Sequence, residues 1–181
     1  MVAPAECPQQ NGQLNFRHTN NSGEALNILT VCTGNICRSP MAEGILRLTD
    51  FPSLRSISVS SAGTHAINGN PATEFAILAS GEKGIDLSEH RARLLDLSLV
   101  SASDVILCME PSQVEWVLSL DSSAFRKIYN LGDFSEHGSG KRRIDDPYGC
   151  SLREFRLCFD EIEKCSRNFL VFYKRQKNLL A

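Results

Sequence analysis

Short apolar runs alternate with longer amphipathic segments from Asn27 onward, and this alternation constrains the fold more than any other feature. The short runs have the length and composition of β-strands, and they cover residues 27–31, 56–60, 105–109 and 127–131. The longer segments predict helices over residues 39–48, from 70 to 81 or 84, 111–118 and 152–174. Strands and helices in this alternation predict an α/β fold built around a parallel sheet.

The composition is that of an ordinary globular protein. Of 181 residues, 42% are hydrophobic and 22% are charged, and the net charge is −2. This balance offers no positive field for nucleic acid or for an anionic membrane surface. No apolar run approaches the roughly 18 residues that a membrane span needs. We therefore expect that the protein does not bind nucleic acid and that it has no membrane-spanning segment.

The amino-terminal segment has a different texture. Residues 1–25 are polar, rich in Asn, Gln and Pro, and without an apolar period, so they predict a flexible extension before a domain at residues 26–181. The segment has no basic start followed by an apolar stretch, and we expect no secretory signal there. The seven cysteines are too sparse for a disulfide-stapled fold, which predicts a cytoplasmic protein with mostly free thiols.

The turn after the first predicted strand reads CTGNICRS, from Cys32 to Ser39, and has the form C-x5-R. Ligands of open α/β sheets bind at the carboxyl ends of the strands, where this turn lies. Successive backbone N–H groups and the start of the next helix can hold an anion there, and Gly34 and Asn35 tolerate a left-handed backbone. Arg38 adds a planar fork of donors suited to phosphate. Such a loop would stabilise the thiolate of Cys32 and activate it as a nucleophile.

Other interpretations of this turn are weaker. The spacing C-x5-R also fits a buried cysteine followed by a surface arginine. A nucleotide-binding loop is excluded because no G-K-[ST] follows Gly34. A zinc site needs a second pair of ligands, which Cys32-x4-Cys37 does not have at ligand spacing. We expect no metal and no cofactor.

Beyond the loop, the chain resembles the low-molecular-weight protein tyrosine phosphatases. The resemblance runs from about residue 27 to 172, and its motifs are VCTGNICRSPMAEG at 31–44, SAGT at 61–64, GIDLS at 84–88, HRAR at 90–93, DVILCME at 104–110 and DPYG at 146–149. It implies a flavodoxin-like, Rossmann-like phosphatase fold whose four-stranded parallel sheet has helices on both faces. It also implies a hydrolase that cleaves phosphotyrosine through a phosphocysteine intermediate.

The resemblance assigns roles to individual residues. Cys32 is implied as the nucleophile, Arg38 as the group that binds the phosphate and its transition state, and Asp146 as the general acid and base. The phosphate-binding loop comprises Thr33, Gly34, Asn35, Ile36, Cys37 and Ser39. Asn35, Ser39, Ser61 and His90 match a hydrogen-bond network that holds the loop, with Ser39 also a possible donor to the Cys32 sulfur.

The cleft and its surroundings follow from the same resemblance. Ile67 and Tyr148 match positions that wall the cleft, and we expect Trp116, Phe155 and Phe169 in the core. Asp145 either raises the pKa of Asp146 by like-charge repulsion or is solvated and inert. Cys37 is either a core residue or a redox partner whose disulfide with the nucleophile protects it.

Three alternatives to phosphotyrosine hydrolysis remain open. Arsenate reduction on the same scaffold requires further redox-active cysteines, for which Cys150, Cys158 and Cys165 are available. Protein arginine phosphatases resemble this chain but tend to carry Thr where Ile36 stands. A phosphopeptide-binding relative without catalysis usually lacks the nucleophile or the acid. The family resemblance implies a phosphotyrosine protein as partner. The motifs look bacterial, and bacterial relatives often act on tyrosine kinases of capsule or exopolysaccharide export, so such a kinase is a candidate substrate.

Overall fold

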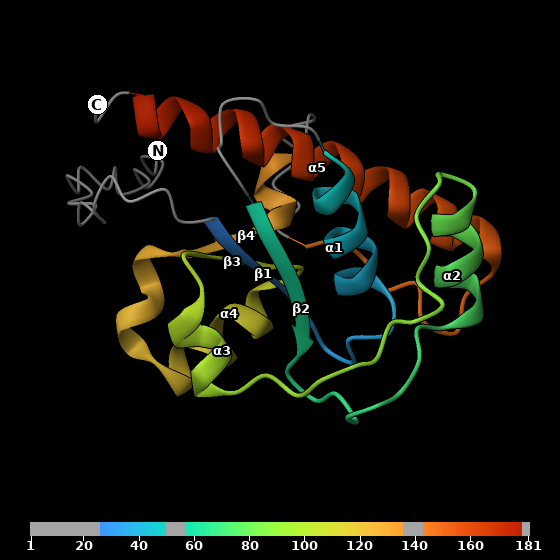
Figure 1. Ribbon diagram of the computed structural model, residues 1–181, viewed down its shortest axis with the longest axis horizontal. Helices are drawn as coiled ribbons and strands as arrows, with labels where there is room; N and C mark the ends of the chain where they lie inside the picture. The colour runs from blue at the N-terminus through green and yellow to red at the C-terminus, as the bar shows by residue number, and fades with distance from the viewer. Residues whose placement is uncertain (1–25, 50–56, 136–142, 179–181) are drawn as a thin grey trace, which may run out of the picture.

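The computed structural model describes residues 26–49, 57–135 and 143–178, which form a parallel sheet between layers of helices (Figure 1). The sheet has the order β2-β1-β3-β4, and all neighbouring strands run parallel. Its strands are β1 (Leu26–Cys32), β2 (Ile57–Gly63), β3 (Val105–Cys108) and β4 (Ile128–Asn130). The predicted four-stranded parallel sheet is thus confirmed. Ser56 and the predicted extension at residues 1–25 lie outside the described residues.

Helices cover both faces of the sheet, as expected. On one side of the sheet lie α1 (Arg38–Leu48) and α5 (Leu152–Asn178), with α2 (Glu74–Gly81) packed against these two helices. On the other side lie α3 (Leu97–Ala102), α4 (Pro111–Leu120) and the 3-10 turn η1 (Ser122–Arg126). A second 3-10 turn, η2 (Leu131–Phe134), follows β4 and contacts α5. In the part of the chain that the structure describes, no helix combines the length and hydrophobicity needed to cross a bilayer.

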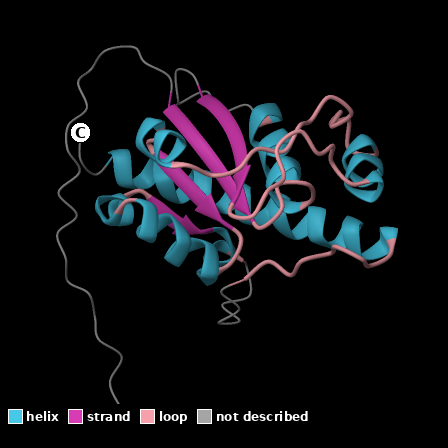
Figure 2. Cartoon of the chain, turned by 90° about the horizontal axis from the view of Figure 1, so that it is seen from below, coloured by secondary structure: helices cyan, strands magenta, loops and turns pink. Residues whose placement is uncertain are grey.

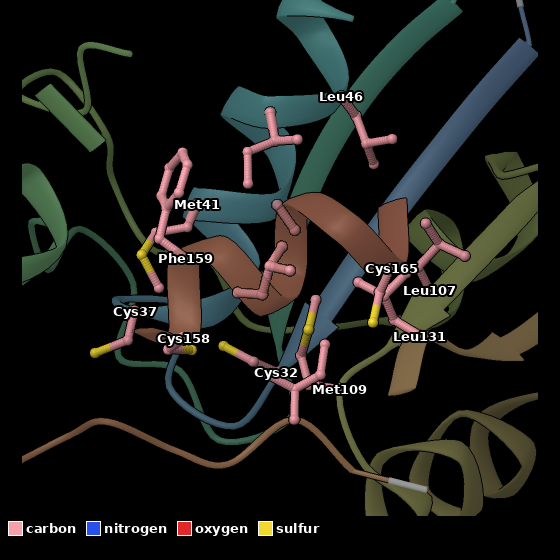
Figure 3. Close-up of a cluster of buried hydrophobic side chains, with 14 of the residues drawn as sticks. Cys32, Cys37, Met41, Leu46, Leu107, Met109, Leu131, Cys158, Phe159 and Cys165 are labelled. Atoms are coloured by element: carbon pink, nitrogen blue, oxygen red, sulfur yellow. The ribbon is translucent and has the colours of Figure 1, made fainter. Parts of the chain in front are cut away.

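The strand sequences explain why the sheet is buried on both faces. In β1, Ile28 belongs to the cluster under α1 and α5, and the next residue, Leu29, belongs to the cluster under α3 and α4. Successive side chains of a strand point to opposite faces, so a strand covered on both sides is apolar throughout. Figure 3 shows the larger cluster, in which Phe159 and Cys165 of α5 face residues of α1 and of the strands.

Several expectations about the helices are wrong in detail. The first helix is capped at Cys37 rather than at Ser39, whose hydroxyl is used elsewhere. The second begins at Glu74, because Thr73 accepts the N–H of Ala76 and so provides the cap that the Asn70-Pro71 turn does not. The helix α3 was not expected, because its six residues are too few to show a helical period in the sequence.

The predicted core aromatics divide into two groups. Phe155 and Phe169 are buried in the cluster under α5, as expected. Trp116 was expected in the core as well, but its side chain is 39% exposed. It stacks on His65 at the surface, because the buried face of α4 is supplied by Val117 and Gln113 instead.

The free edge of β2 is occupied by hydrogen-bond partners from outside the sheet. Arg47 of α1 donates to the carbonyl of Val59 through Nε and Nη2, at 3.2 and 3.0 Å. Arg93 donates through Nε to the carbonyl of Ser61 at 2.6 Å. Gly63 exchanges backbone hydrogen bonds with the segment at residues 93–95. Every second residue from Val59 to Gly63 is therefore paired on the outer side.

Candidate active site

The segment at residues 32–39 lies where β1 ends and α1 begins, at the carboxyl edge of the sheet where the loops gather (Figure 2). Asn35 is the only residue other than glycine with a positive φ, 54°, among the residues that the structure describes. Its buried side chain donates to the hydroxyls of Ser39 and Ser61, at 2.9 and 2.8 Å. Its Oδ1 accepts the N–H of Arg93 at 2.9 Å. The asparagine thus ties the loop to α1, to β2 and to the segment beside it.

Cys32 ends β1 and is 3% exposed. Its Sγ accepts the backbone N–H of Asn35 at 3.2 Å and lies 3.0 Å from the Oγ of Ser39. His90 closes the turn from the other side, with Nε2 2.7 Å from the carbonyl of Asn35. The sulfur therefore lies in a loop whose backbone is held at several points, with two hydrogen-bonding groups directed at it.

Arg38 begins α1 and is 2% exposed, although its side chain is charged. Its Nη1 donates to the carbonyl of Ile144 at 3.1 Å, and its Nη2 lies 2.5 Å from Oδ2 of Asp146. Both terminal nitrogens are 3.4 Å from Oε1 of Glu110. The Nε is buried and has no hydrogen-bond partner within the described ranges. A buried guanidinium with one unsatisfied donor can accommodate an anion at the loop.

Asp146 reaches the loop from far along the chain. The backbone N–H of Ile144 bonds to the carbonyl of Met109 at 2.8 Å, which anchors this segment beside the end of β3. The carboxylate of Asp146 accepts the N–H of Tyr148 at 3.2 Å, and Cys150 N–H closes a turn on the carbonyl of Pro147 at 2.9 Å. The turn chemistry of DPYG fixes the local backbone, and the Arg38 contact brings the carboxylate to the loop.

The neighbouring Asp145 is engaged on the surface. Its Oδ1 lies 3.1 Å from Nε of Arg143, and its carbonyl accepts from the Sγ of Cys158 at 3.6 Å. Two charges of opposite sign therefore face each other beside Asp146. The carboxylate of Asp145 is exposed and paired with Arg143.

Glu110 and Gln113 belong to the site and were not predicted as site residues. Glu110 follows β3 at the same edge of the sheet, and the Nε2 of Gln113 donates to its Oε1 at 2.7 Å. The same Nε2 lies 3.3 Å from the hydroxyl of Thr33, and the Oε1 of Gln113 accepts the N–H of Met109 at 2.8 Å. The pair orients Arg38 through Glu110. The sequence signal that could have identified Glu110 is its position shortly after the buried strand β3.

Cys37 is buried at 3% exposure, and its Sγ lies 3.4 Å from the hydroxyl of Thr73. Desolvation raises the pKa of its thiol to about 12, against a smaller lowering by the Thr73 hydrogen bond. The thiol is therefore protonated at neutral pH, and its packing alone accounts for its position. Cys32, Cys37 and Cys158 belong to the same buried cluster (Figure 3).

The two predicted cleft residues are on the surface. Ile67 is 70% exposed and Tyr148 is 66% exposed, one in the segment after β2 and one in the turn that carries Asp146. Gly34 and Ile36 are half-buried, while Thr33 is exposed. The loop thus presents its first residue, Thr33, to solvent.

A separate cavity of about 550 Å³ lies behind the loop, between α1, β2 and residues 84–93. It is lined on one side by Glu43 and Arg47 and on the other by His90 and Arg93. Cys32 does not line it. Two residues that line the cavity, His90 and Arg93, form hydrogen bonds with Asn35 of the loop.

Comparison with known proteins decides the family. The model of the family described as low molecular weight phosphotyrosine protein phosphatase matches residues 27–179. This chain belongs to that family. It is similar to the probable low molecular weight protein-tyrosine-phosphatase EpsP of Ralstonia nicotianae, at 40% identity over 137 residues that cover 76% of this chain and 88% of EpsP.

Solved structures of the family agree with the fold. The crystal structure of the Erwinia amylovora tyrosine phosphatase AmsI is similar with a TM-score of 0.71 and 31% identity, covering 81% of this chain and 92% of AmsI. The YwlE arginine phosphatase from Geobacillus stearothermophilus is similar with a TM-score of 0.73 and 30% identity, covering 84% of this chain and 95% of YwlE. The Rossmann-like phosphatase fold expected from the motifs is confirmed. The two scores do not separate tyrosine from arginine phosphatases.

Proposed function

We propose that this member of the family hydrolyses phosphotyrosine in proteins, with Cys32 as nucleophile, Arg38 as phosphate ligand and Asp146 as general acid and base. The observation that carries the proposal is the contact between Asp146 and Arg38, 2.5 Å apart although 108 residues separate them in the chain. Arg38 itself lies in the loop that Cys32 begins. This contact supports a site in which a nucleophile, an anion-binding group and a proton donor act together.

The first step transfers the phosphoryl group to the enzyme. The Cys32 thiolate attacks phosphorus, a P–S bond forms, and the P–O bond to the phenol breaks. Asp146 gives its proton to the departing phenolic oxygen and becomes a carboxylate. The loop N–H groups and Arg38 hold the equatorial phosphate oxygens as charge redistributes.

The second step regenerates the enzyme. The Asp146 carboxylate takes a proton from a water molecule, whose oxygen attacks phosphorus while the P–S bond breaks. Inorganic phosphate leaves, and Cys32 returns to the thiolate. The Oγ of Ser39 and the N–H of Asn35, already beside the sulfur, stabilise the leaving thiolate in this step.

The ion pair between Arg38 and Asp146 has a role in substrate binding. A phosphate dianion competes with the carboxylate for the guanidinium and satisfies its unpaired Nε. The released carboxylate takes up a proton from solvent, and the protonated Asp146 then turns toward the leaving oxygen. Glu110 and Ile144 keep their contacts with Arg38 during this exchange, so the guanidinium stays in place.

The alternatives are less consistent with the geometry. An arsenate reductase passes a disulfide along further cysteines, but of the three candidates only Cys150 is exposed, Cys158 and Cys165 are buried, and desolvation raises the pKa of Cys158. Ile36 is bulkier than the Thr typical of arginine phosphatases, which favours a phenyl ester over a phosphoguanidinium. Among protein substrates, we propose a tyrosine kinase of capsule or exopolysaccharide export, by analogy with the bacterial members.

The test is hydrolysis of p-nitrophenyl phosphate by the wild type and by single variants. Cys32→Ser should abolish turnover, while Cys150→Ser, at the exposed thiol, serves as the matched control that retains it. Unchanged turnover in Cys32→Ser would refute the assignment. Phosphotyrosine peptides should be hydrolysed faster than phosphoarginine peptides, and arsenate should not drive oxidation of thioredoxin. Copurification with Cys32→Ser as a trap identifies the protein substrate.

A further inference from the structure

His65 and Trp116 form a tilted aromatic pair on the surface. Their ring centroids are 4.6 Å apart with an interplanar angle of 53°, and the indole is 39% exposed. A tryptophan is a large apolar side chain that is usually well covered. The mechanism above does not use this pair, and the packing of α4 on the sheet is supplied by the buried Val117.

His65 and the helix that carries Trp116 both contact the first residues of the phosphate-binding loop. The backbone N–H of His65 donates to the carbonyl of Thr33 at 2.9 Å, one residue after Thr64 bonds to Cys32 at 3.0 Å. On the other side, Gln113 of α4 lies 3.3 Å from the hydroxyl of Thr33. The pair therefore spans the two segments that border the exposed side of Thr33.

The distance from the loop suits a residue near the phosphotyrosine of a bound peptide. Glu110 contacts Arg38, and Trp116 follows six residues later along α4. With a rise of 1.5 Å per residue, this places the backbone of Trp116 about 9 Å from Glu110 along the helix axis. An extended peptide advances about 3.3–3.6 Å per residue, so the second or third residue from the phosphotyrosine reaches this far.

The two segments that carry the pair favour a cation, although Arg91 and Arg93 lie in the next segment, which is bonded to residues 63–70. Residues 111–120 of α4 and residues 64–70 contain no lysine or arginine. Carboxylates precede the indole at Glu115 and mark the start of the helix at Glu110. Tryptophan is the best aromatic partner of a cationic side chain, and guanidinium groups stack on it most often.

We propose that the His65–Trp116 pair is a substrate subsite that binds an arginine or lysine two or three residues from the phosphotyrosine. This subsite rests on the proposed phosphotyrosine phosphatase function and adds a sequence preference to it. The indole face holds the cation while the phosphate occupies the loop. The preference acts on binding, so it changes KM more than kcat.

The test uses phosphotyrosine peptides on an alanine background. Arginine, glutamate or phenylalanine is placed two or three residues before or after the phosphotyrosine, and kcat and KM are measured for each peptide. Arginine at one of these positions should raise kcat/KM about two- to fivefold over alanine, mainly through a lower KM, as expected for an exposed cation–π contact. Glutamate at the same position should lower kcat/KM.

Variants locate the preference. Trp116→Leu should remove the arginine gain, and Trp116→Phe should retain part of it. Phe125→Ala removes an exposed aromatic in η1, before β4 and so at the opposite edge of the sheet, and should retain the gain in full. His65→Ala gives a second variant for the case in which Trp116→Leu is unstable, and it should reduce the gain because the indole loses its stacking partner.

The outcomes separate the two proposals. If the wild type does not hydrolyse the alanine parent peptide, the proposed function itself fails. If it hydrolyses the parent but shows no arginine gain at any position, only the subsite is overturned. An equal gain in the wild type and in Trp116→Leu, or a larger gain for phenylalanine than for arginine, also overturns it.

Discussion

Replacing Asn35 by alanine tests the role of the loop network most directly. The side chain makes three hydrogen bonds inside the protein, to Ser39, Ser61 and the N–H of Arg93. Each is worth about 1 kcal/mol of stability, and their partners would be left buried without them. Alanine at a φ of 54° loses the tolerance of asparagine for the left-handed region, which costs about 1 kcal/mol more. The expected loss is about 4 kcal/mol of unfolding free energy.

Urea denaturation of Asn35→Ala measures this loss through the midpoint, provided that the slope m is unchanged. Turnover of p-nitrophenyl phosphate should also fall by about 10²-fold, because the loop around Cys32 is displaced. Asn168→Ala on α5 is the matched control, since it removes one hydrogen bond to the carbonyl of Phe134 in η2. It should cost about 1 kcal/mol or less and retain turnover. A loss below about 1 kcal/mol in Asn35→Ala would refute the reasoning.

Three further results are expected. Asp146→Asn should lower kcat for p-nitrophenyl phosphate by about 10²- to 10⁴-fold, and less for an aryl phosphate with a more acidic leaving group, which needs no proton. Arg38→Lys should lower kcat by at least about 10²-fold, since lysine cannot reproduce the fork that contacts Glu110 and Asp146, and wild-type turnover would contradict this. Burial raises the pKa of Cys37 from 9.0 to about 12, so the folded state keeps a proton that the unfolded state releases. Stability is therefore full below pH 9 and falls as the pH rises toward 12, and urea midpoints should fall less steeply in Cys37→Ala.

The strands could be predicted because each carries its signal locally. The run Val105–Cys108 is apolar at every position, as a strand covered on both faces must be, and its predicted and observed ends differ by one residue. The loop at residues 32–39 was also a local prediction, since it required only a strand, a turn that tolerates a positive φ, and a helix start. Asn35 does adopt that conformation.

The remaining features depend on contacts across the chain. No spacing rule could bring Asp146 to Arg38, and the family resemblance alone suggested it. The helical period of α4 predicts an apolar face but does not say which residues a neighbouring loop will cover. Trp116 was therefore assigned to the core, although its stacking partner, His65, comes from the segment after β2. Glu110 was overlooked for the same reason, because its partners lie on other elements.

The outer side of β2 has a consequence for how the protein behaves among its own copies. An edge strand with free carbonyl and N–H groups is a template on which another chain can add a strand, and this is a route to aggregation. Here Arg47 and Arg93 occupy the carbonyls of Val59 and Ser61, and Gly63 is already paired. Arg93 also holds Asn35, so the residue that shields the sheet from association is one that shapes the phosphate-binding loop. Substitution of Arg93 would then free the carbonyl of Ser61 and weaken solubility, while the bond to Asn35, which the backbone N–H makes, would remain.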